Sequence, residues 1–138
     1  MSPIEEAPLA ARIPRGLSIL LVEDDIALAG VMSHWARWVG AAMDMAAFGA
    51  EALVLAAQKP YDAVLLDLTL PDMEGGAVYD RMIELRPLLA SRVIVFTGGA
   101  VSGESQDFLH RTSCPVVLKP FELETLARQI TKLKCTAA

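Results

Sequence analysis

The chain has 138 residues, of which 54% are hydrophobic and 21% are charged, and its net charge is −5 at pH 7. This length and apolar content favour one globular domain with a substantial core and argue against disorder. The acidic balance, with no cluster of Lys and Arg, argues against sequence-independent binding of DNA or RNA, because that binding neutralises phosphates with basic side chains.

No apolar stretch approaches the roughly 20 residues that a membrane-spanning helix needs. Residues 1–16 also lack the apolar segment of a signal peptide, so we expect a cytoplasmic protein. The two cysteines, Cys114 and Cys135, form no CxxC or Cys/His motif. We therefore expect ordinary thiols rather than a disulfide framework or a zinc site.

The predicted elements begin at residue 18, where short apolar runs start to alternate with helical patterns. Residues 1–17 contain three prolines and no apolar period, so we expect a flexible tail or linker before a domain at 18–138. Strands are predicted at 18–22, 42–46, 61–66, 92–96 and 115–118. Helices are predicted between and after them, around residues 28–39, 50–57, 78–85, 103–112 and 123–133.

This alternation of five strands with five helices predicts an α/β fold with a parallel sheet covered on both faces. The runs LLV, AVLL, VIVF and VVL are continuously apolar, which is typical of strands buried on both faces. The helix at 103–112 has only Phe108 and Leu109 as clear apolar anchors, so we expect it to be the most weakly held.

Chemically active side chains follow four of the predicted strands. They are Glu23, Asp24 and Asp25 after the first strand, Asp67 after the third, Thr97 after the fourth and Lys119 after the fifth. A single Asp in such a place is most often a helix N-cap. Because open α/β sheets bind ligands at the carboxyl ends of their strands, the joint placement predicts a binding site at that edge.

The chemistry of these side chains indicates a phosphoryl group beside a metal ion. Carboxylates held close together repel one another unless a cation joins them, and a site of oxygen ligands suits Mg²⁺. Lys119 and Thr97 are suited to contact an oxygen-rich anion. A carboxylate beside the metal can itself accept a phosphoryl group and form an acyl phosphate.

The sequence resembles the receiver domains of two-component response regulators over residues 18–134. The resemblance rests on LLVEDD at 20–25, YDAVLLDLTLPDMEGG at 61–76, VIVFTGG at 93–99 and VVLKPF at 116–121. The later half is particularly similar to receivers of hybrid sensor histidine kinases. The resemblance implies a flavodoxin-like, doubly wound sheet with strand order 2-1-3-4-5.

The resemblance also implies site roles. Asp67 is the phosphoacceptor, and Mg²⁺ is held by Glu23, Asp24, Asp67 and the backbone carbonyl of Thr69. Thr97 contacts the phosphoryl group, and Lys119 pairs with that group or, before phosphorylation, with Asp67. The bond before Pro120 is expected to be cis. Asp25 is expected to cap the first helix, whereas Pro71, Asp72 and Gly75 shape the loop after the phosphoacceptor strand.

The implied function is a phosphoacceptor signalling domain rather than an enzyme. A histidine kinase or histidine phosphotransfer protein supplies the phosphoryl group in a phosphorelay, and the domain signals through protein contacts as a monomer or weak homodimer. We expect no nucleic-acid or membrane partner. One alternative is a pseudo-receiver that only binds proteins, which would have lost an acid or the lysine. Another is an aspartyl phosphatase, but Thr69 stands where such enzymes need a second acid.

The sequence departs from the family at the position of an aromatic switch residue. Many receivers carry an aromatic residue three positions before the lysine, where this chain has Val116. Since Gly98 and Gly99 precede a weakly anchored helix, we hypothesise that signalling works through ordering of residues 98–112. The first helix faces the histidine-bearing partner in the family, which makes residues 31–38 a candidate interface.

Two further features carry no assigned chemistry. His34 and His110 stand in no recognisable phosphotransfer context, so we expect ordinary histidines. Trp35 is expected to pack in the core, and Trp38 to be partly exposed and available to a partner.

Overall fold

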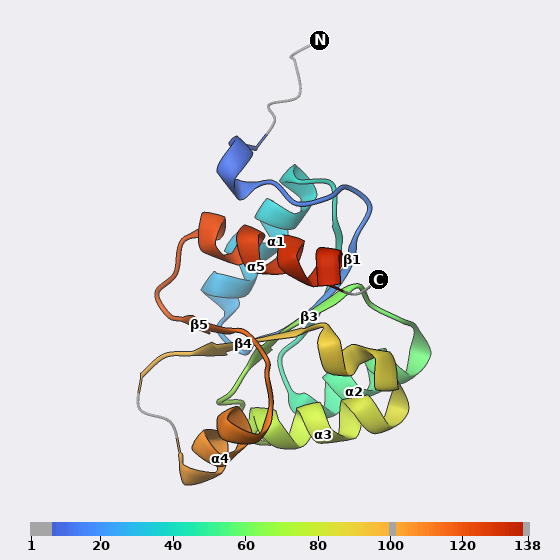
Figure 1. The fold of residues 1–138 in the computed structure, drawn as a ribbon, viewed down its shortest axis with the longest axis vertical. Coiled ribbons are helices and arrows are strands. Elements are labelled where there is room, and N and C mark those ends of the chain that lie inside the picture. Colours follow the sequence, from blue (N-terminus) through green and yellow to red (C-terminus); the bar gives the residue numbers. More distant parts are fainter. Residues whose placement is uncertain (1–6, 100–101, 137–138) are drawn as a thin grey trace.

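The computed structural model describes residues 7–99 and 102–136, which form a three-layer α/β arrangement (Figure 1). Its strands are β1 (Ser18–Val22), β2 (Ala42–Ala46), β3 (Ala63–Asp67), β4 (Val93–Thr97) and β5 (Val116–Leu118). Its α-helices are α1 (Ile26–Trp38), α2 (Gly49–Gln58), α3 (Gly75–Leu85), α4 (Gly103–Arg111) and α5 (Leu123–Thr136). Short 3₁₀ helices occur at η1 (Leu9–Ala11) and η2 (Pro87–Ser91).

All five strands pair in parallel in the order β2-β1-β3-β4-β5, which confirms the predicted topology. Strand β2 lies on one side of β1, and β3, β4 and β5 follow one another on the other side. The strand order therefore reverses between β1 and β3, and the carboxyl ends of these two strands flank the crevice in which ligands bind in such sheets.

Two apolar cores lie on opposite faces of the sheet. Helices α1 and α5 cover one face, and α2, α3 and α4 cover the other (Figure 1). Every residue of β3 and β4 is buried, and so are the last four residues of β1. The continuous apolar runs of these central strands thus match their burial on both faces.

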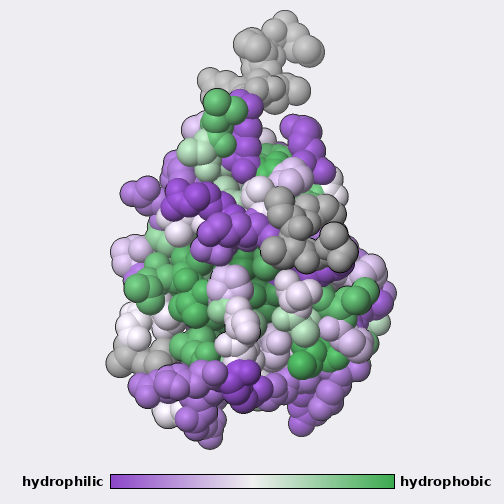
Figure 2. Space-filling view, viewed as in Figure 1, coloured by the Kyte–Doolittle hydropathy of each residue, from purple (hydrophilic) through white to green (hydrophobic). Residues whose placement is uncertain are grey.

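The edge strand β5 does not follow that expectation. Val117 is buried, but Val116 and Leu118 are 42% and 66% exposed. The reason is that α4 packs against α3, where Phe108 contacts the ring of Tyr79 edge-on, and leaves one face of β5 uncovered. Figure 2 shows hydrophobic surface at the level of this sheet edge, between polar surfaces above and below it.

Residues 7–17 also differ from the sequence prediction, which made them part of a flexible tail. Ala7, Ile13 and Leu17 are buried in the core formed with α1 and α5, and Ala11 is also buried. The indole N–H of Trp35 donates a hydrogen bond of 3.0 Å to the carbonyl of Ala11. These residues therefore extend the domain, whereas residues 1–6 of the expected tail lie outside the described part of the chain.

Candidate functional site

The structure brings the side chains predicted from the strand ends to one edge of the sheet. Glu23 follows the last residue of β1, Asp67 and Thr97 are the last residues of β3 and β4, and Lys119 follows β5 directly. Their strands are neighbours in register, with Asp67 opposite Phe96 and Thr97 opposite Leu118. Residues up to 96 positions apart in the sequence therefore meet at one site.

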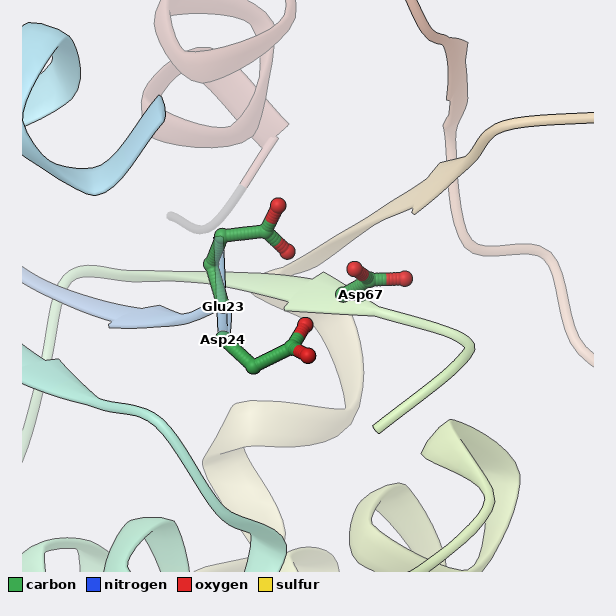
Figure 3. Close-up of side chains that lie close together, drawn as sticks. All are labelled: Glu23, Asp24 and Asp67. Carbon is green, nitrogen blue, oxygen red and sulfur yellow. The ribbon is translucent and has the colours of Figure 1, made fainter. Parts of the chain in front are cut away.

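Three carboxylates cluster at the reversal point between β1 and β3. One carboxylate oxygen from each of Glu23, Asp24 and Asp67 lies within 4.8 Å of the others. Figure 3 shows Glu23 and Asp24 leaving the end of β1 on the two sides of the chain and both approaching Asp67. Glu23 and Asp67 are buried and Asp24 is exposed, so the cluster opens to solvent on the Asp24 side.

Both carboxylate oxygens of Asp67 have a fixed partner. The backbone N–H of Thr69 donates to Oδ1 at 2.9 Å, and the ammonium of Lys119 donates to Oδ2 at 2.9 Å. The same ammonium donates to Oε1 of Glu23 at 2.6 Å. Lys119 therefore bridges two buried carboxylates, and Asp67 is held in one orientation at the mouth of the crevice.

The electrostatics of the cluster favour the arrival of a cation. Burial, together with the neighbouring Asp67, raises the pKa of Glu23 to about 8, even though Lys119 acts in the opposite direction. Burial alone would raise the pKa of Asp67, but hydrogen bonding with Glu23, Thr69 and Lys119 lowers it overall. Three acids and one lysine leave a formal charge of −2 when all are ionised, which one divalent ion balances.

The donor set fits Mg²⁺. All three acids offer hard carboxylate oxygens, and Oε2 of Glu23 is buried without a hydrogen-bond partner in the structure. A buried carboxylate oxygen without a partner is costly, and coordination to a cation, directly or through a bound water, relieves that cost. Mg²⁺ takes oxygen ligands and retains several waters, which suits a site with an exposed side.

The remaining residues singled out from the sequence fall as follows. Thr97 is buried at the end of β4, and the Lys119–Pro120 bond is cis, as the family resemblance implied. Asp25 caps α1, since its carboxylate accepts from the N–H groups of Ala27 and Leu28. It is thus a capping residue, as expected, and not part of the acid cluster.

The two histidines and two tryptophans also match the simpler expectations. His34 and His110 are exposed on their helices, and Trp35 is buried in the core beside α5. Trp38 is exposed at the end of α1. Cys114, the cysteine whose side chain is described, is half-buried, and burial raises the pKa of its thiol.

Sequence reasoning treated Asp72 as a plain turn residue, and the structure shows a second role. Its carboxylate accepts from the N–H groups of Gly49 and Ala50 at 2.7 and 3.0 Å. It therefore caps the first turn of α2 from another loop, and those two hydrogen bonds lower its pKa. The partner is 23 residues away, so no local pattern could have predicted it.

Gly75, the first residue of α3, is a glycine that a close backbone approach requires. A Cβ at this position would lie 2.6 Å from Cα of Leu68 and 2.7 Å from the carbonyl oxygen of Asp67. Its own N–H donates to the carbonyl of Leu68 at 2.8 Å. The start of α3 is thereby packed directly against the backbone that carries the phosphoacceptor candidate.

Comparison with known proteins identifies the family. Residues 19–131 match the response regulator receiver domain family. The chain is 30% identical over 94% of its length to two-component system protein A of Emericella nidulans, covering 19% of that protein. It is also 30% identical, over 93% of its length, to the aerobic respiration control sensor protein ArcB of Escherichia coli, covering 16% of it.

Solved structures of receiver domains are similar to this structure. The receiver domain of a sensor histidine kinase from Pseudomonas aeruginosa, with a magnesium ion in its active site cleft, matches with a TM-score of 0.78 at 26% identity, over 88% of this chain and 99% of that one. A CheY-like receiver domain protein from Methanospirillum hungatei matches with a TM-score of 0.77 at 30% identity, over 86% of this chain and 94% of that one.

The chain therefore belongs to the response regulator receiver domain family of two-component signalling. It spans less than a fifth of the length of the two curated relatives described above. Among the residues that the structure describes, no helix is long and apolar enough to cross a membrane.

Proposed function

We propose that Asp67 accepts a phosphoryl group, in a Mg²⁺-dependent reaction, from a phosphohistidine of a histidine kinase or phosphotransfer protein. The observation that carries the proposal is the environment of the Asp67 carboxylate. It lies at the strand-order reversal, fixed by Lys119 and Thr69, with two further acids within 4.8 Å. A structural N-cap aspartate needs none of these partners.

The reaction follows from this geometry. A carboxylate oxygen of Asp67 attacks phosphorus, the new O–P bond forms as the N–P bond breaks, and the imidazole leaves with the electron pair and takes up a proton. The N–H of Thr69 keeps the carboxylate oriented for attack. Lys119 transfers its hydrogen bond from Asp67 to a phosphoryl oxygen, and the hydroxyl of Thr97 donates to another.

Glu23, Asp24, Asp67 and the backbone carbonyl of Thr69 hold the metal in this proposal. When bound, Mg²⁺ stabilises the negative charge that gathers on the phosphoryl oxygens during transfer. The unpartnered oxygen of Glu23 and the cluster of three acids support this assignment. The magnesium ion in the cleft of the similar Pseudomonas receiver domain supports it as well.

We also propose that the phosphohistidine partner docks on α1. Ile26, the first residue of this helix, and Val31 are exposed apolar side chains, and Trp38 is exposed at its end. Ile26 lies two positions after Asp24, so a protein covering this helix also reaches the site. Trp38→Ala is expected to slow phosphotransfer from the partner without affecting phosphorylation by a small donor. Unchanged transfer from the partner contradicts this docking face.

Intact-mass measurement after incubation with acetyl phosphate and Mg²⁺ tests the phosphoacceptor assignment. We expect a gain of one phosphoryl group that requires Mg²⁺ and disappears in Asp67→Ala. Asp80→Ala is the matched control, because Asp80 makes an exposed ion pair with Arg111 on α3 and α4. An adduct that persists in Asp67→Ala, or none in the unchanged protein, overturns the proposal. Repeated turnover of phosphate esters would instead indicate a phosphatase.

A further inference from the structure

The loop that follows Asp67, residues 68–74, contacts two helices through acidic side chains. Asp72 caps α2, as described above. Glu74, at the other end of the loop, contacts the first turn of α4. We refer to residues 68–74 as the β3–α3 loop. Its two acids therefore connect the phosphoacceptor strand with helices on either side of α3.

Glu74 holds the first turn of α4 through one carboxylate oxygen. The hydroxyl of Ser105, which is buried, donates to Oε2 of Glu74 at 2.9 Å, and the hydroxyl of Ser102 donates to the same oxygen at 3.4 Å. The hydroxyl of Ser102 in turn accepts from the N–H of Ser105 as the N-cap of α4. A carboxylate beside a helix N-terminus is also favoured by the helix dipole.

Helix α4 also contacts α3. Phe108 packs on Gly76, where a Cβ would lie 3.0 Å from the Phe108 ring, and against Tyr79 edge-on. The ion pair between Arg111 and Asp80 is about half exposed on both sides, so it contributes little. A pocket of about 180 Å³, open to solvent, lies between the two helices and is lined in part by Glu74. Glu74 therefore supplies the main polar anchor of α4.

Glu74 is connected to the phosphoacceptor by a short path along the backbone. The N–H of Thr69 donates to Asp67 Oδ1, and Thr69 forms an isolated antiparallel β-bridge with Glu74. When Asp67 becomes an acyl phosphate, the negative charge moves from its carboxyl to the added phosphoryl oxygens, so Oδ1 accepts the hydrogen bond from Thr69 less strongly. The pairing of Thr69 with Glu74 is then free to shift.

We propose that Glu74 couples the chemical state of Asp67 to the position of α4, so that phosphorylation releases the first turn of this helix. This inference rests on the proposed function of Asp67. It assigns the coupling to the β3–α3 loop in a chain that has Val116, exposed on β5, in place of an aromatic switch. Because α4 is already anchored before phosphorylation, the expected response is release rather than the ordering hypothesised from the sequence. Residues 100 and 101 of that hypothesis lie outside the described part of the chain.

Amide hydrogen exchange of residues 103–111, before and after phosphorylation by acetyl phosphate and Mg²⁺, tests the coupling, with intact mass recorded on the same samples. In the unchanged protein we expect exchange in α4 to become about tenfold faster or more, the effect of losing one hydrogen bond to a charged group. In Glu74→Ala the exchange is already fast and phosphorylation does not change it. The adduct still forms, because Glu74 contacts neither Asp67 nor the acid cluster.

Two further variants sharpen the test. Ser105→Ala removes the closer of the two hydroxyl donors to Glu74, so exchange in α4 should rise in the same direction as in Glu74→Ala. Asp72→Ala removes the equivalent acid on the α2 side, so exchange at 49–51 should rise while α4 still responds to phosphorylation. A full α4 response in Glu74→Ala, or no response in the unchanged protein despite an adduct, overturns the coupling. Absence of the adduct in the unchanged protein overturns the proposed function itself, and the coupling with it.

Discussion

Replacement of Lys119 by methionine is the sharpest test of the electrostatics of the site. The ammonium lies 2.6 Å from Glu23 and 2.9 Å from Asp67. Its removal raises the pKa of Glu23 further, so Glu23 stays protonated at the assay pH, and it leaves the buried carboxylate of Asp67 without a counter-charge. Removing one partner of a buried ion pair costs about 3–5 kcal/mol. The Lys119 side chain is 23% exposed, so water already screens part of the interaction, and we expect a loss of about 2–3 kcal/mol.

The assay is urea unfolding at pH 7.5 in the presence of a chelator. Lys59→Met is the matched control, because Lys59 pairs with Asp44 at 2.7 Å but the two side chains are 48% and 37% exposed. An ion pair that exposed contributes less than ~1 kcal/mol. If Lys119→Met and Lys59→Met lose the same stability, the interpretation of Lys119 as the counter-charge of the acid cluster is wrong.

Mg²⁺ gives a second readout on the same variant. Binding to the native state stabilises a protein by about 2.7 kcal/mol at a hundredfold excess over Kd. We expect Mg²⁺ to stabilise Lys119→Met more than the unchanged protein, since the metal then supplies the only positive charge beside Asp67 among the described contacts of the site. If Mg²⁺ stabilises neither protein, the three acids do not form a cation site.

Three further predictions concern the scaffold. Gly75→Ala should lower the free energy of unfolding by about 2 kcal/mol, or Tm by about 7 °C, because the added Cβ meets backbone atoms. Gly30→Ala, in open space on α1, should raise the free energy of unfolding by about 0.5–1 kcal/mol. Equal effects of the two substitutions in thermal unfolding would refute the close approach at Gly75. Trp35→Phe should cost about 1 kcal/mol and expose residues 7–17 to proteolysis, since the bond to Ala11 is lost. Hydrogen bonds with Lys59 and Tyr61 lower the pKa of Asp44. The stability that Asp44→Asn loses should therefore be largest above pH 4 and vanish as pH falls through that lowered pKa. A stability difference between the two proteins that grows as pH falls contradicts this.

The fold was predictable because the periodicity that encodes it is local. The strands 18–22 and 42–46 match β1 and β2. The other three begin one or two residues later than predicted, and β3 and β4 also end one residue later. Asp67 and Thr97 thereby became the last residues of their strands rather than the first residues after them. Boundaries of this kind depend on hydrogen bonds to neighbouring strands, which an isolated segment does not specify.

The predicted site residues meet at one edge because parallel strands share a direction. Once β1, β3, β4 and β5 are parallel, their carboxyl ends must lie at the same end of the sheet. The residues found there are Glu23, Asp67, Thr97 and Lys119. Sequence order therefore predicted which residues are present at the site. It did not predict that Lys119 bridges Glu23 as well as Asp67, because that depends on side-chain geometry.

The sequence by itself determined the family and the acidic residues that follow the strands, because motifs of fixed spacing carry both. The strand order was implied by the resemblance to that family. Only the tertiary structure decided the contacts whose partners lie far apart. Glu74 reaches Ser105 across 31 positions, and Trp35 ties down residues 7–17 through Ala11, 24 positions away. These contacts arise from helices packing on a sheet, where neighbours are set by three-dimensional proximity, and no local pattern records them.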